Sequence, residues 1–415
     1  MLKKITIENY RSCLRTTFEC HPRLSVLIGP NGSGKTNVLQ AILFLYKIWQ
    51  DDEYQRFREE PITVTSRIRA LFHVPPANAV LNASIDAYTD ASNNDIVVDA
   101  KRRWTLSEAK GKKIAVQTLP WHSRGVIWYH RQAHARRPRQ TLLADSRGRV
   151  LCWPGDKPGI IEPWISSSVA KVVQFCSGIR YYSASQFTNP SACPVSFEIE
   201  KEGPRSRHFR APGHARTLYR MYMAQKNEDD KYANFMSMVG PKGLGLVDDV
   251  TFKEVPTSSI DYAVRVGGRL EKRRRCRLLI IPRFRIGRHK LSPNQLSEGT
   301  FKTLALLFYI MTEESKALLI EEPEVCIHQG LLASILELMK THADRKQMIV
   351  STHSDYVLDH VSPDNVFQVK RDKLEGTHVK HIRKNMTRKE FSALRHYLQS
   401  EGNLGEYWRE GALED

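Results

Sequence analysis

The sequence predicts an α/β fold that is organised around a phosphate-binding loop. Residues 28–37 read IGPNGSGKTN, with the apolar run LSVLI before them and the apolar run VLQAILFLY after them. Strand, glycine-rich loop and helix in this order surround a phosphate with backbone N–H groups and a helix N-terminus. From residue 294 onward, apolar runs of strand length alternate with helical patterns, which is also typical of α/β domains.

The loop fits the pattern G-x-x-x-x-G-K-[ST], which is typical of nucleoside triphosphate binding. Its glycines allow the chain to bend so that successive N–H groups point at phosphate oxygens. We expect Lys35 to bridge the outer phosphates and the Thr36 hydroxyl to hold Mg²⁺, so ATP and Mg²⁺ are the predicted cofactors. The predicted nucleotide-binding residues of the loop are Gly29, Pro30, Asn31, Gly32, Ser33, Gly34, Lys35, Thr36 and Asn37.

The remaining elements follow from hydrophobic periodicity and turn residues. Two short strands are expected before the loop, at 3–9 and 15–20. The middle of the chain predicts strands at 80–88, 95–104, 126–131, 250–256, 260–266 and 277–287, and helices at 163–178 and 214–238. The C-terminal part predicts helices at 298–313 and 329–342 and strands at 317–321 and 347–351. A capping box at 387–390 opens a last helix that reaches about residue 400.

Composition narrows the class of protein. The chain has 415 residues with 41% hydrophobic content, enough for a sizeable core and one or two domains. No apolar run is long enough to span a bilayer, so we expect no membrane partner. The seven cysteines are scattered without a C-x-x-C pair, which argues against a zinc ribbon or a disulfide framework and favours a cytoplasmic protein.

The charge is strongly positive and unevenly distributed. The formal net charge is +18, and the excess lies mostly between residues 100 and 300. Basic clusters occur at 101–103 (KRR), 136–139 (RRPR) and 272–275 (KRRR). Such clusters favour a polyanionic partner, either a nucleic acid or an acidic protein, over a merely solvated surface. The sequence does not separate these two kinds of partner.

Two further motifs carry the groups that an NTP-hydrolysing site needs. In EEPE (321–324) a run of strand residues ends in two carboxylates, which repel each other unless a cation lies near. Glu321 is placed to complete the Mg²⁺ shell, and Glu322 is placed to polarise the attacking water. In STHS (351–354), His353 follows another apolar run and could reach the γ-phosphate.

Two weaker motifs stand at a helix start and at a turn. LSEGT (296–300) places Ser297 and Gly299 at the beginning of an apolar helix, where an anion can bind. NYRS (9–12) places Arg11 between the first two strands. Alone, each pattern is as typical of an ordinary cap or surface residue as of a site.

The joint order of these motifs resembles the ABC-type ATPase head shared by the SMC, RecF and OLD families. The opening ITIENYRS…LSVLIGPNGSGKTNVLQAI is similar to the start of RecF. The resemblance makes LSEGT the signature motif, EEPE the Walker B motif with its catalytic glutamate, and 326–328 the D-loop region. It implies catalytic roles for Glu322, His353 and Lys35, and it places Arg11 near the nucleotide. Gln186, in YYSASQFTNP, is the candidate for the Q-loop glutamine that contacts the metal.

The resemblance covers roughly 1–48 and 290–370, so the predicted fold is a discontinuous ATPase head with a mixed α+β insertion between Walker A and the signature motif. The expected domains are the head at 1–50 and 290–385, an inserted region with basic patches at 51–289, and a C-terminal helix and tail at 386–415. The inserted region is expected to be part core sheet and part lid. Glu298 stands where transporters usually have glycine, and Glu321 where aspartate is commoner, so a transporter subunit is disfavoured.

In the ABC-type ATPase heads that this sequence resembles, the signature motif contacts the nucleotide bound by a second head. The resemblance therefore implies an ATP-sandwich homodimer, or a higher homo-oligomer. The compact head and the LGEYWREGALE tail resemble ATPase subunits of bacterial antiphage defence systems such as Septu, PARIS and retron-associated ATPases. No nuclease motif is recognisable, so the effector would be a separate nuclease or toxin. The alternatives are a RecF-like DNA-repair ATPase and a scaffold that uses ATP only as structural glue.

Overall fold

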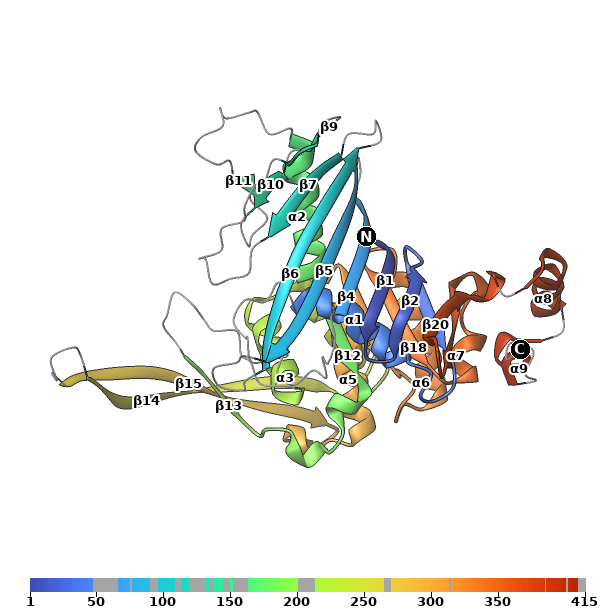
Figure 1. Cartoon of the computed structure of the whole chain (residues 1–415). Helices are drawn as coiled ribbons and strands as arrows, with labels where there is room; N and C mark the ends of the chain where they lie inside the picture. The colour runs from blue at the N-terminus through green and yellow to red at the C-terminus, as the bar shows by residue number, and fades with distance from the viewer. Residues whose placement is uncertain are drawn as a thin grey trace. The chain divides into compact units, whose positions relative to one another are not determined.

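The computed structural model describes most of the chain as two compact units (Figure 1). The first unit comprises Met1–Tyr181, Glu314–Glu322 and Met339–Asp415, and the second comprises Tyr182–Glu313 and Pro323–Leu338. Each unit is described here by itself. The described residues are 1–47, 66–74, 77–89, 96–108, 113–118, 132–134, 137–139, 141–144, 150–151, 163–200, 213–264, 270–312, 315–384, 386–400 and 402–409.

A six-stranded sheet with the order β12-β17-β18-β3-β19-β20 carries the phosphate loop. Strands β17, β18, β3 and β19 pair in parallel, and β20 runs antiparallel to β19. Every residue of β3 and of β18 is buried, as is typical of parallel strands that are covered on both faces. The bounds are β3 Leu24–Ile28, β12 Ile179–Ser183, β17 Ala317–Glu321, β18 Gln347–Thr352, β19 Val366–Asp372 and β20 Gly376–His381.

Helix α1 (Lys35–Lys47) packs on this sheet, whereas its neighbour α2 (Pro163–Ser177) packs on the other sheet of the first unit. Helix α1 packs against β17 and β18 through an apolar stripe at helical spacing. Helix α2 brings Phe175 edge-on to Phe72, with 5.4 Å between the ring centroids. Helix α6 spans Gln329–His342. Among the described residues, no helix combines the length and the apolar character that crossing a bilayer requires.

An eight-stranded sheet with the order β11-β10-β7-β6-β5-β4-β1-β2 completes the first unit. Its strands pair antiparallel, except that β10 runs parallel to β7. The strand bounds are β1 Leu2–Tyr10, β2 Cys13–Glu19, β4 Ser66–Val74, β5 Ala77–Thr89, β6 Ile96–Glu108, β7 Lys113–Thr118, β10 Thr141–Ala144 and β11 Val150–Leu151. A separate pair is formed by β8 (Gln132–His134) and β9 (Arg137–Arg139).

Gln347, at the start of β18, joins the two sheets of the first unit. Its buried side chain accepts a hydrogen bond from the backbone N–H of Leu2 at 3.1 Å. It also donates to the carbonyl oxygens of Leu2 at 2.8 Å and His21 at 2.9 Å. Because a buried amide needs partners, this residue fixes β1 against the end of the parallel sheet.

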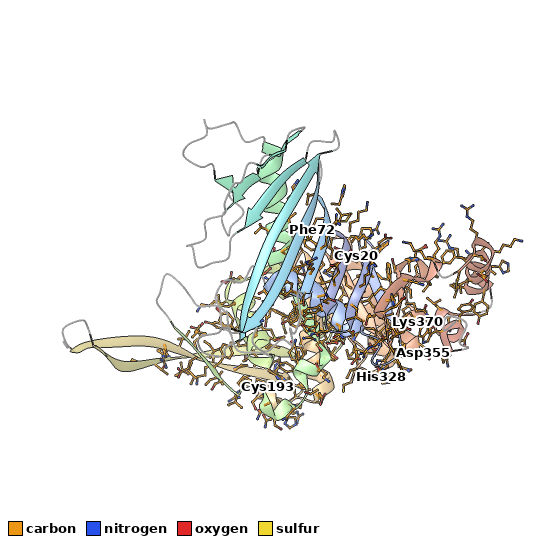
Figure 2. The ribbon with its side chains drawn as sticks, in the orientation of Figure 1. Cys20, Phe72, Cys193, His328, Asp355 and Lys370 are labelled. Carbon is orange, nitrogen blue, oxygen red and sulfur yellow. The ribbon has the colours of Figure 1, made fainter. Side chains whose placement is uncertain are left out.

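The C-terminal helices pack beside the end of β18. Helix α9 (Leu404–Arg409) lies on α7 (Asp355–Asp359), where the Gly405 N–H donates to Asp359 Oδ1 at 2.7 Å. Arg409 Nε lies 2.9 Å from Asp355 Oδ2, and Asp355 is labelled in Figure 2. Helix α8 spans Arg388–Ser400. Helix α9 therefore packs directly against α7, the segment that follows His353.

The second unit combines helices with an antiparallel sheet. Its aromatic core joins Tyr182, Phe187 and Phe301, and Phe235 meets Phe308 edge-on at 5.4 Å. Its sheet has the order β13-β15-β14, with β16 paired to β15. The bounds are α3 His214–Lys226, α4 Asp230–Val239, α5 Glu298–Met311, β13 Phe197–Glu200, β14 Asp249–Val264, β15 Leu270–Ile286 and β16 His289–Leu291.

The α/β class with several sheets is confirmed, and the strands predicted at 24–28 and 317–321 match β3 and β17 to the residue. The helix predicted at 214–238 is wrong in one respect, because it is two helices. Glu228 has a φ of 51° between them, and the Asp229 side chain caps α4. The strands predicted at 250–256 and 260–266 are one strand, β14. The strand predicted at 126–131 lies outside the described residues, and the predicted domain boundaries stay a prediction.

Candidate functional site

The phosphate loop lies where the chain leaves the buried strand β3 and enters α1. A side chain at Gly29 would collide with the carbonyl oxygen of Val369, and Gly34 has a φ of +101°, which favours glycine. Lys35 is buried, and its Nζ donates to the carbonyl oxygens of Gly29 at 2.6 Å and Pro30 at 3.0 Å. The loop therefore wraps around the ammonium group of Lys35.

A chain of four polar groups supports the loop from the side of β20. Asn37 Nδ2 donates to Ser12 Oγ at 2.6 Å, and the Ser12 and Thr377 hydroxyls lie 2.7 Å apart. Thr377 Oγ1 donates to the carbonyl oxygen of Ser33 at 3.1 Å. Because the Thr377 hydroxyl already donates its hydrogen bond to the Ser33 carbonyl oxygen, the Ser12 hydroxyl must be the donor in the bond between Ser12 and Thr377. Each donor is used once, and the network ties helix α1, the β1–β2 turn and β20 to one peptide of the loop.

Two predicted metal ligands meet at the ends of neighbouring elements. The Thr36 hydroxyl, in the first turn of α1, donates to Glu321 Oε1 at the end of β17. The other oxygen, Glu321 Oε2, accepts from the hydroxyl of Tyr181 in β12. Tyr181 was not predicted from the sequence, although its place in a strand beside β17 brings it to the same edge of the sheet.

The second carboxylate of EEPE faces the histidine of STHS. Glu322 has a φ of 49°, and its N–H donates to the carbonyl oxygen of Ser351 at 2.9 Å. Glu322 Oε1 lies 3.6 Å from His353 Nδ1, and both side chains are partly exposed. A positive φ in a non-glycine residue turns the chain sharply, so successive carboxylates leave the strand in different directions. One of the two contacts Thr36 and the other contacts His353.

Arg11 occupies the turn between β1 and β2, beside Ser12 of the hydroxyl network. Asn9 and Arg11 both have a φ of 53°, a conformation that few non-glycine residues adopt. The Arg11 guanidinium carbon lies 5.6 Å from the ring centroid of Tyr10. The structure thus connects this turn to the phosphate loop through Ser12, the neighbour of Arg11.

The residues of this edge fit a Mg²⁺-bound triphosphate. The Ser33 and Ser351 hydroxyls are buried, and neither has a hydrogen-bond partner within the described part of the chain. The glycines of the phosphate loop leave a space that a side chain would fill, and Lys35 supplies a cation. One hydroxyl and one carboxylate suit Mg²⁺, which usually keeps waters and phosphate oxygens as its other ligands. The described residues contain no group of three or more metal-binding side chains.

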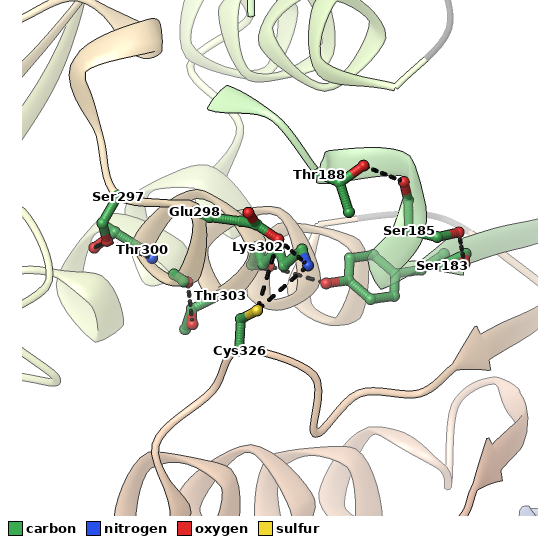
Figure 3. Close-up of polar contacts among 11 residues, drawn as sticks. Ser183, Ser185, Thr188, Ser297, Glu298, Thr300, Lys302, Thr303 and Cys326 are labelled. Carbon is green, nitrogen blue, oxygen red and sulfur yellow. Dashed lines mark hydrogen bonds and ion pairs between the residues drawn. The ribbon is translucent and has the colours of Figure 1, made fainter. Parts of the chain in front are cut away.

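The signature motif lies in the second unit, at the start of α5 (Figure 3). Ser297 is the N-cap, and its Oγ accepts from the Thr300 N–H at 3.1 Å. A Cβ at Gly299 would lie 2.6 Å from the carbonyl oxygen of Cys326, so the D-loop region runs against this helix start. A serine cap of this kind forms without the lysine and carboxylate groups that lie beside the phosphate loop.

An ion pair between a buried lysine and a partly exposed glutamate lies beneath the signature motif. Lys302 has no exposed surface, and its Nζ lies 2.5 Å from Glu298 Oε1 and 3.6 Å from Cys326 Sγ (Figure 3). The hydrogen bond from Lys302 is the main reason that the pKa of Glu298 lies below its ordinary value. The glutamate that distinguishes LSEGT from the transporter pattern therefore neutralises a buried lysine.

Gln186, the predicted Q-loop residue, lies in a short 3-10 helix of the second unit (Ala184–Phe187). Its carbonyl oxygen would lie 2.8 Å from a Cβ at Gly213, the residue that precedes α3. Gln186 belongs to the second unit, whereas Thr36 and Glu321 belong to the first, so its contact with the metal stays a prediction. Likewise Ser297 and Gly299 belong to the second unit, so their meeting with the nucleotide stays a prediction.

Two family models match separate segments of the chain. Residues 1–118 match the "RecF/RecN/SMC N terminal domain". Residues 231–359, which include the signature, EEPE and STHS motifs, match a family described as "AAA domain, putative AbiEii toxin, Type IV TA system". The first matched segment contains the phosphate loop and Arg11. Together, the two matched segments contain every predicted site residue except Gln186.

The chain is also similar to characterised proteins. A 64-residue segment is 42% identical to the DNA replication and repair protein RecF of Staphylococcus haemolyticus and 38% identical to that of Staphylococcus epidermidis. The segment is 14% of this chain and spans 17% of each relative.

Among solved structures, an SMC head bound to the C-winged helix domain of ScpA is 13% identical with a TM-score of 0.44. That match covers 93% of this chain and 99% of the other. The SMC head domain from Thermotoga maritima is 12% identical with a TM-score of 0.37, covering 91% and 97%. The sequence matches, rather than these structural likenesses, carry the assignment. The two family matches together support an ABC-type ATPase head of the SMC and RecF group.

Proposed function

We propose that the protein is an ATP-driven switch, in which ATP closes two copies of the head on each other and hydrolysis loosens them. The observation that carries this proposal is the pairing at one sheet edge. Thr36 bonds Glu321, and Glu322 faces His353, at the ends of the neighbouring strands β3, β17 and β18. This edge holds a cation, a hydroxyl, and two carboxylates with different partners, which are the groups that phosphoryl transfer to water needs.

In this mechanism the side chains of the first unit divide the work. Lys35 and the loop N–H groups hold the outer phosphates, and Thr36 and Glu321 would hold Mg²⁺, with Tyr181 orienting the Glu321 carboxylate. Bound Mg²⁺ would supply charge neutralisation on the phosphate oxygens. Glu322 orients the attacking water and accepts its proton, and His353 steadies the Glu322 carboxylate from 3.6 Å.

The signature motif supplies the second half of the site in trans. The start of α5 offers backbone N–H groups and the positive end of a helix dipole, which attract an anion. It offers no counterpart of Lys35 or of the EEPE carboxylates, so it completes a site rather than forming one. We therefore propose a homodimer in which Ser297 of one copy meets the triphosphate held by Lys35 of the other.

The Glu322→Gln variant tests the assignment of the base. Because a well-placed base contributes roughly 10²–10⁴ to the rate, we expect hydrolysis to fall at least a hundredfold while ATP affinity changes little. The variant should accumulate as an ATP-bound dimer in light scattering. Glu324→Gln is the matched control from the same motif and should hydrolyse ATP at close to the wild-type rate. Wild-type hydrolysis by Glu322→Gln would show that Glu322 is not the base.

For the biological role, we propose a regulatory ATPase of a bacterial antiphage defence system that controls a separate nuclease or toxin. The match of residues 231–359 to a family whose description names a toxin system supports this role. The alternative is a RecF-like ATPase of DNA repair, which the RecF-like segment supports. Purification of tagged Glu322→Gln protein from its host, followed by mass spectrometry, separates the two. A co-purifying nuclease or toxin supports defence, and DNA with repair proteins supports the alternative.

A further inference from the structure

The second unit contains a long antiparallel ribbon made of β14 (Asp249–Val264) and β15 (Leu270–Ile286), which we name the basic ribbon. Its register runs without a break from Asp249↔Arg285 to Val264↔Leu270. At about 3.4 Å per residue, strands of this length extend roughly 50 Å. Figure 1 shows β14 and β15 reaching well beyond α3 of the same unit.

Positive charge is concentrated on one strand of this ribbon. Residues 270–290, which are β15 and the turn into β16, contain nine Lys or Arg residues and one Glu, a net charge of +8. That is a large part of the +18 of the whole chain, within one twentieth of its length. The run 272–275 pairs with 259–262 of β14, where Asp261 is the one acidic residue. Over 249–264 and 270–290 together, the sequence has ten Lys or Arg residues and four Asp or Glu residues.

We call the part of the basic ribbon that packs against α3 the proximal ribbon. Its two faces have different surroundings. On one face, Ile280, Phe284 and Val250 are buried, and Tyr222 of α3 packs against Phe252 at 5.7 Å. Glu254 shares this face and is held there, because its Oε1 accepts from the Tyr222 hydroxyl at 2.7 Å and from Lys226 at 3.0 Å. Its carboxylate is therefore occupied on the helix side of the ribbon.

The opposite face of the proximal ribbon carries exposed cations, with Asp249 across from Arg285 at its end. Lys253, Arg283 and Arg285 occupy the alternate positions of the two strands, and all three are exposed. At the base of the ribbon, Arg288 and Lys290 are exposed as well. Arg277, further along the same strand, is paired with Glu198 at 3.0 Å. In the sequence, the cations at the base are followed on the same strand by the run 272–275.

Beyond Arg277 the ribbon has two strands only, within the described part of the chain. Strand β13 pairs with β15 from Phe197↔Ile280 to Glu200↔Arg277 and goes no further. From Ser258↔Cys276 to Val264↔Leu270, β15 pairs with β14 alone. A two-stranded hairpin in water is marginal in stability, so this part of the chain is not explained by core formation.

We propose that the basic ribbon binds duplex nucleic acid. A two-stranded β-ribbon fits the major groove of B-form DNA, and a length of roughly 50 Å exceeds one helical turn of about 34 Å. Arginine, which makes up seven of the nine cations between 270 and 290, matches phosphate with a planar pair of donors. A regular ribbon with cations along its length matches a regular line of phosphates, whereas an acidic protein presents carboxylates on an irregular surface. The proposal goes beyond the ATP switch and does not depend on it.

A matched pair of triple variants of the full-length protein tests this proposal. R273Q/R274Q/R275Q removes three cations from β15, and K101Q/R102Q/R103Q removes three from the strand β6 in the first unit. Affinity for a fluorescein-labelled 30-base-pair duplex is measured by anisotropy without nucleotide, from 50 to 200 mM NaCl. We expect the β15 variant to bind at least about tenfold more weakly and to lose roughly 2–3 from the salt slope, since each phosphate contact contributes about 0.9. The β6 variant should change affinity less than threefold.

Three outcomes would overturn the proposal: equal losses in both variants, no duplex binding by the wild type at 50 mM NaCl, or displacement of the duplex by poly-L-glutamate at equal charge concentration. The last would assign the ribbon to an acidic protein. Folding is checked by the thermal midpoint, and R283Q/R285Q/R288Q, with exposed side chains at the base, provides a second test if the first variant does not fold. ATP hydrolysis is measured on the same samples. Absence of ATP hydrolysis by the wild type would refute the proposed switch but would not change the conclusion about the basic ribbon.

Discussion

Helix α1 in the first unit and helix α5 in the second both begin beside a glycine and a hydroxyl side chain, but their surroundings differ. At α1, Lys35 lies inside the loop, Thr36 bonds Glu321, and the network through Thr377 supports Ser33 from behind. At α5, Ser297 caps its own helix and bonds Thr300. The first start has a cation and predicted metal ligands, whereas at the second the cation Lys302 is paired with Glu298 of the same helix.

The difference indicates a division of labour between two halves of one site. A helix start attracts an anion wherever it occurs, but binding a triphosphate and activating water require further groups that converge on it. Those groups come from the ends of parallel strands, which meet at the edge of the six-stranded sheet. The signature helix has an ion pair beneath it instead, between Glu298 and Lys302, which stabilises its own unit. Variants can therefore separate the ligand-binding role of each start from its structural role.

The largest effect is expected from Ser297→Asp. Aspartate caps a helix as well as serine does, so the fold of α5 should be preserved. Its negative charge would face the triphosphate of the partner, and like charges brought together cost several kcal/mol, so ATP-dependent dimerisation should weaken at least about a hundredfold. Ser297→Asn, an equally good but neutral cap, is the control. Analytical ultracentrifugation with ATP measures the effect, and equal dimerisation of the Asp and Asn variants would refute the role of Ser297.

A smaller effect is expected from Thr377→Val, which removes one hydroxyl from the network behind the phosphate loop. The carbonyl oxygen of Ser33 and the hydroxyl of Ser12 would each lose a buried partner, at a cost of about 1–3 kcal/mol. We expect the KM for ATP to rise about tenfold with a smaller change in kcat, because the loop loses its support and the base does not move. Thr377→Ser should restore most of the KM. An unchanged KM in Thr377→Val would mean that the network supports the fold alone.

The smallest effect is expected beneath the signature motif, and it depends on pH. The pKa of Glu298 is lowered in the folded state, mainly by Lys302, so the pair stabilises the protein above the ordinary pKa of a glutamate. This contribution is lost as the pH falls through the lowered folded-state pKa. Glu298→Gln should therefore lower the thermal midpoint by a few degrees at pH 7 and reduce its slope with pH on the acid side.

The double variant E298Q/K302M is the control for this pair, because replacing both partners of a buried ion pair costs less than removing one. We expect it to recover most of the midpoint that Glu298→Gln loses. If the double variant melts no higher than Glu298→Gln, the buried charge of Lys302 is not the cause of the loss.

The sequence predicted what is contiguous and missed what is assembled from distant segments. The strand, loop and helix around Lys35 are one segment, so a local pattern was sufficient. Ser12 and Thr377 are 365 residues apart, and the strand β20 that brings them together was not predicted. Tyr181 is found at Glu321 only after β12 is known to neighbour β17. No local pattern contains that neighbourhood.

Errors in the middle of the chain have local causes that the sequence partly displayed. The break between α3 and α4 lies in the polar run NEDD, where Asp229 caps the second helix, so a capping signal was available. The division of β14 into two strands came from the polar pair Ser258-Ser259, which cross-strand pairing with β15 keeps extended. Pairing overrides a local preference here, as it often does in strands.

Mixing two inactive variants tests the shared site most directly. Glu322→Gln lacks the base but has Ser297, and Ser297→Asp has the base but lacks the serine. In a mixed dimer one site then has both defects and the other has none. If two heads share each ATP, mixing equal amounts of the two proteins should restore hydrolysis to at most about a quarter of the wild-type rate, the value for random pairing, in which half of the dimers are mixed and each has one intact site of two. Stable Glu322→Gln homodimers lower the mixed fraction, so an excess of Ser297→Asp should raise the rate per Glu322→Gln chain. A rate no higher than the average of the separate variants would contradict a site built from two copies of the chain.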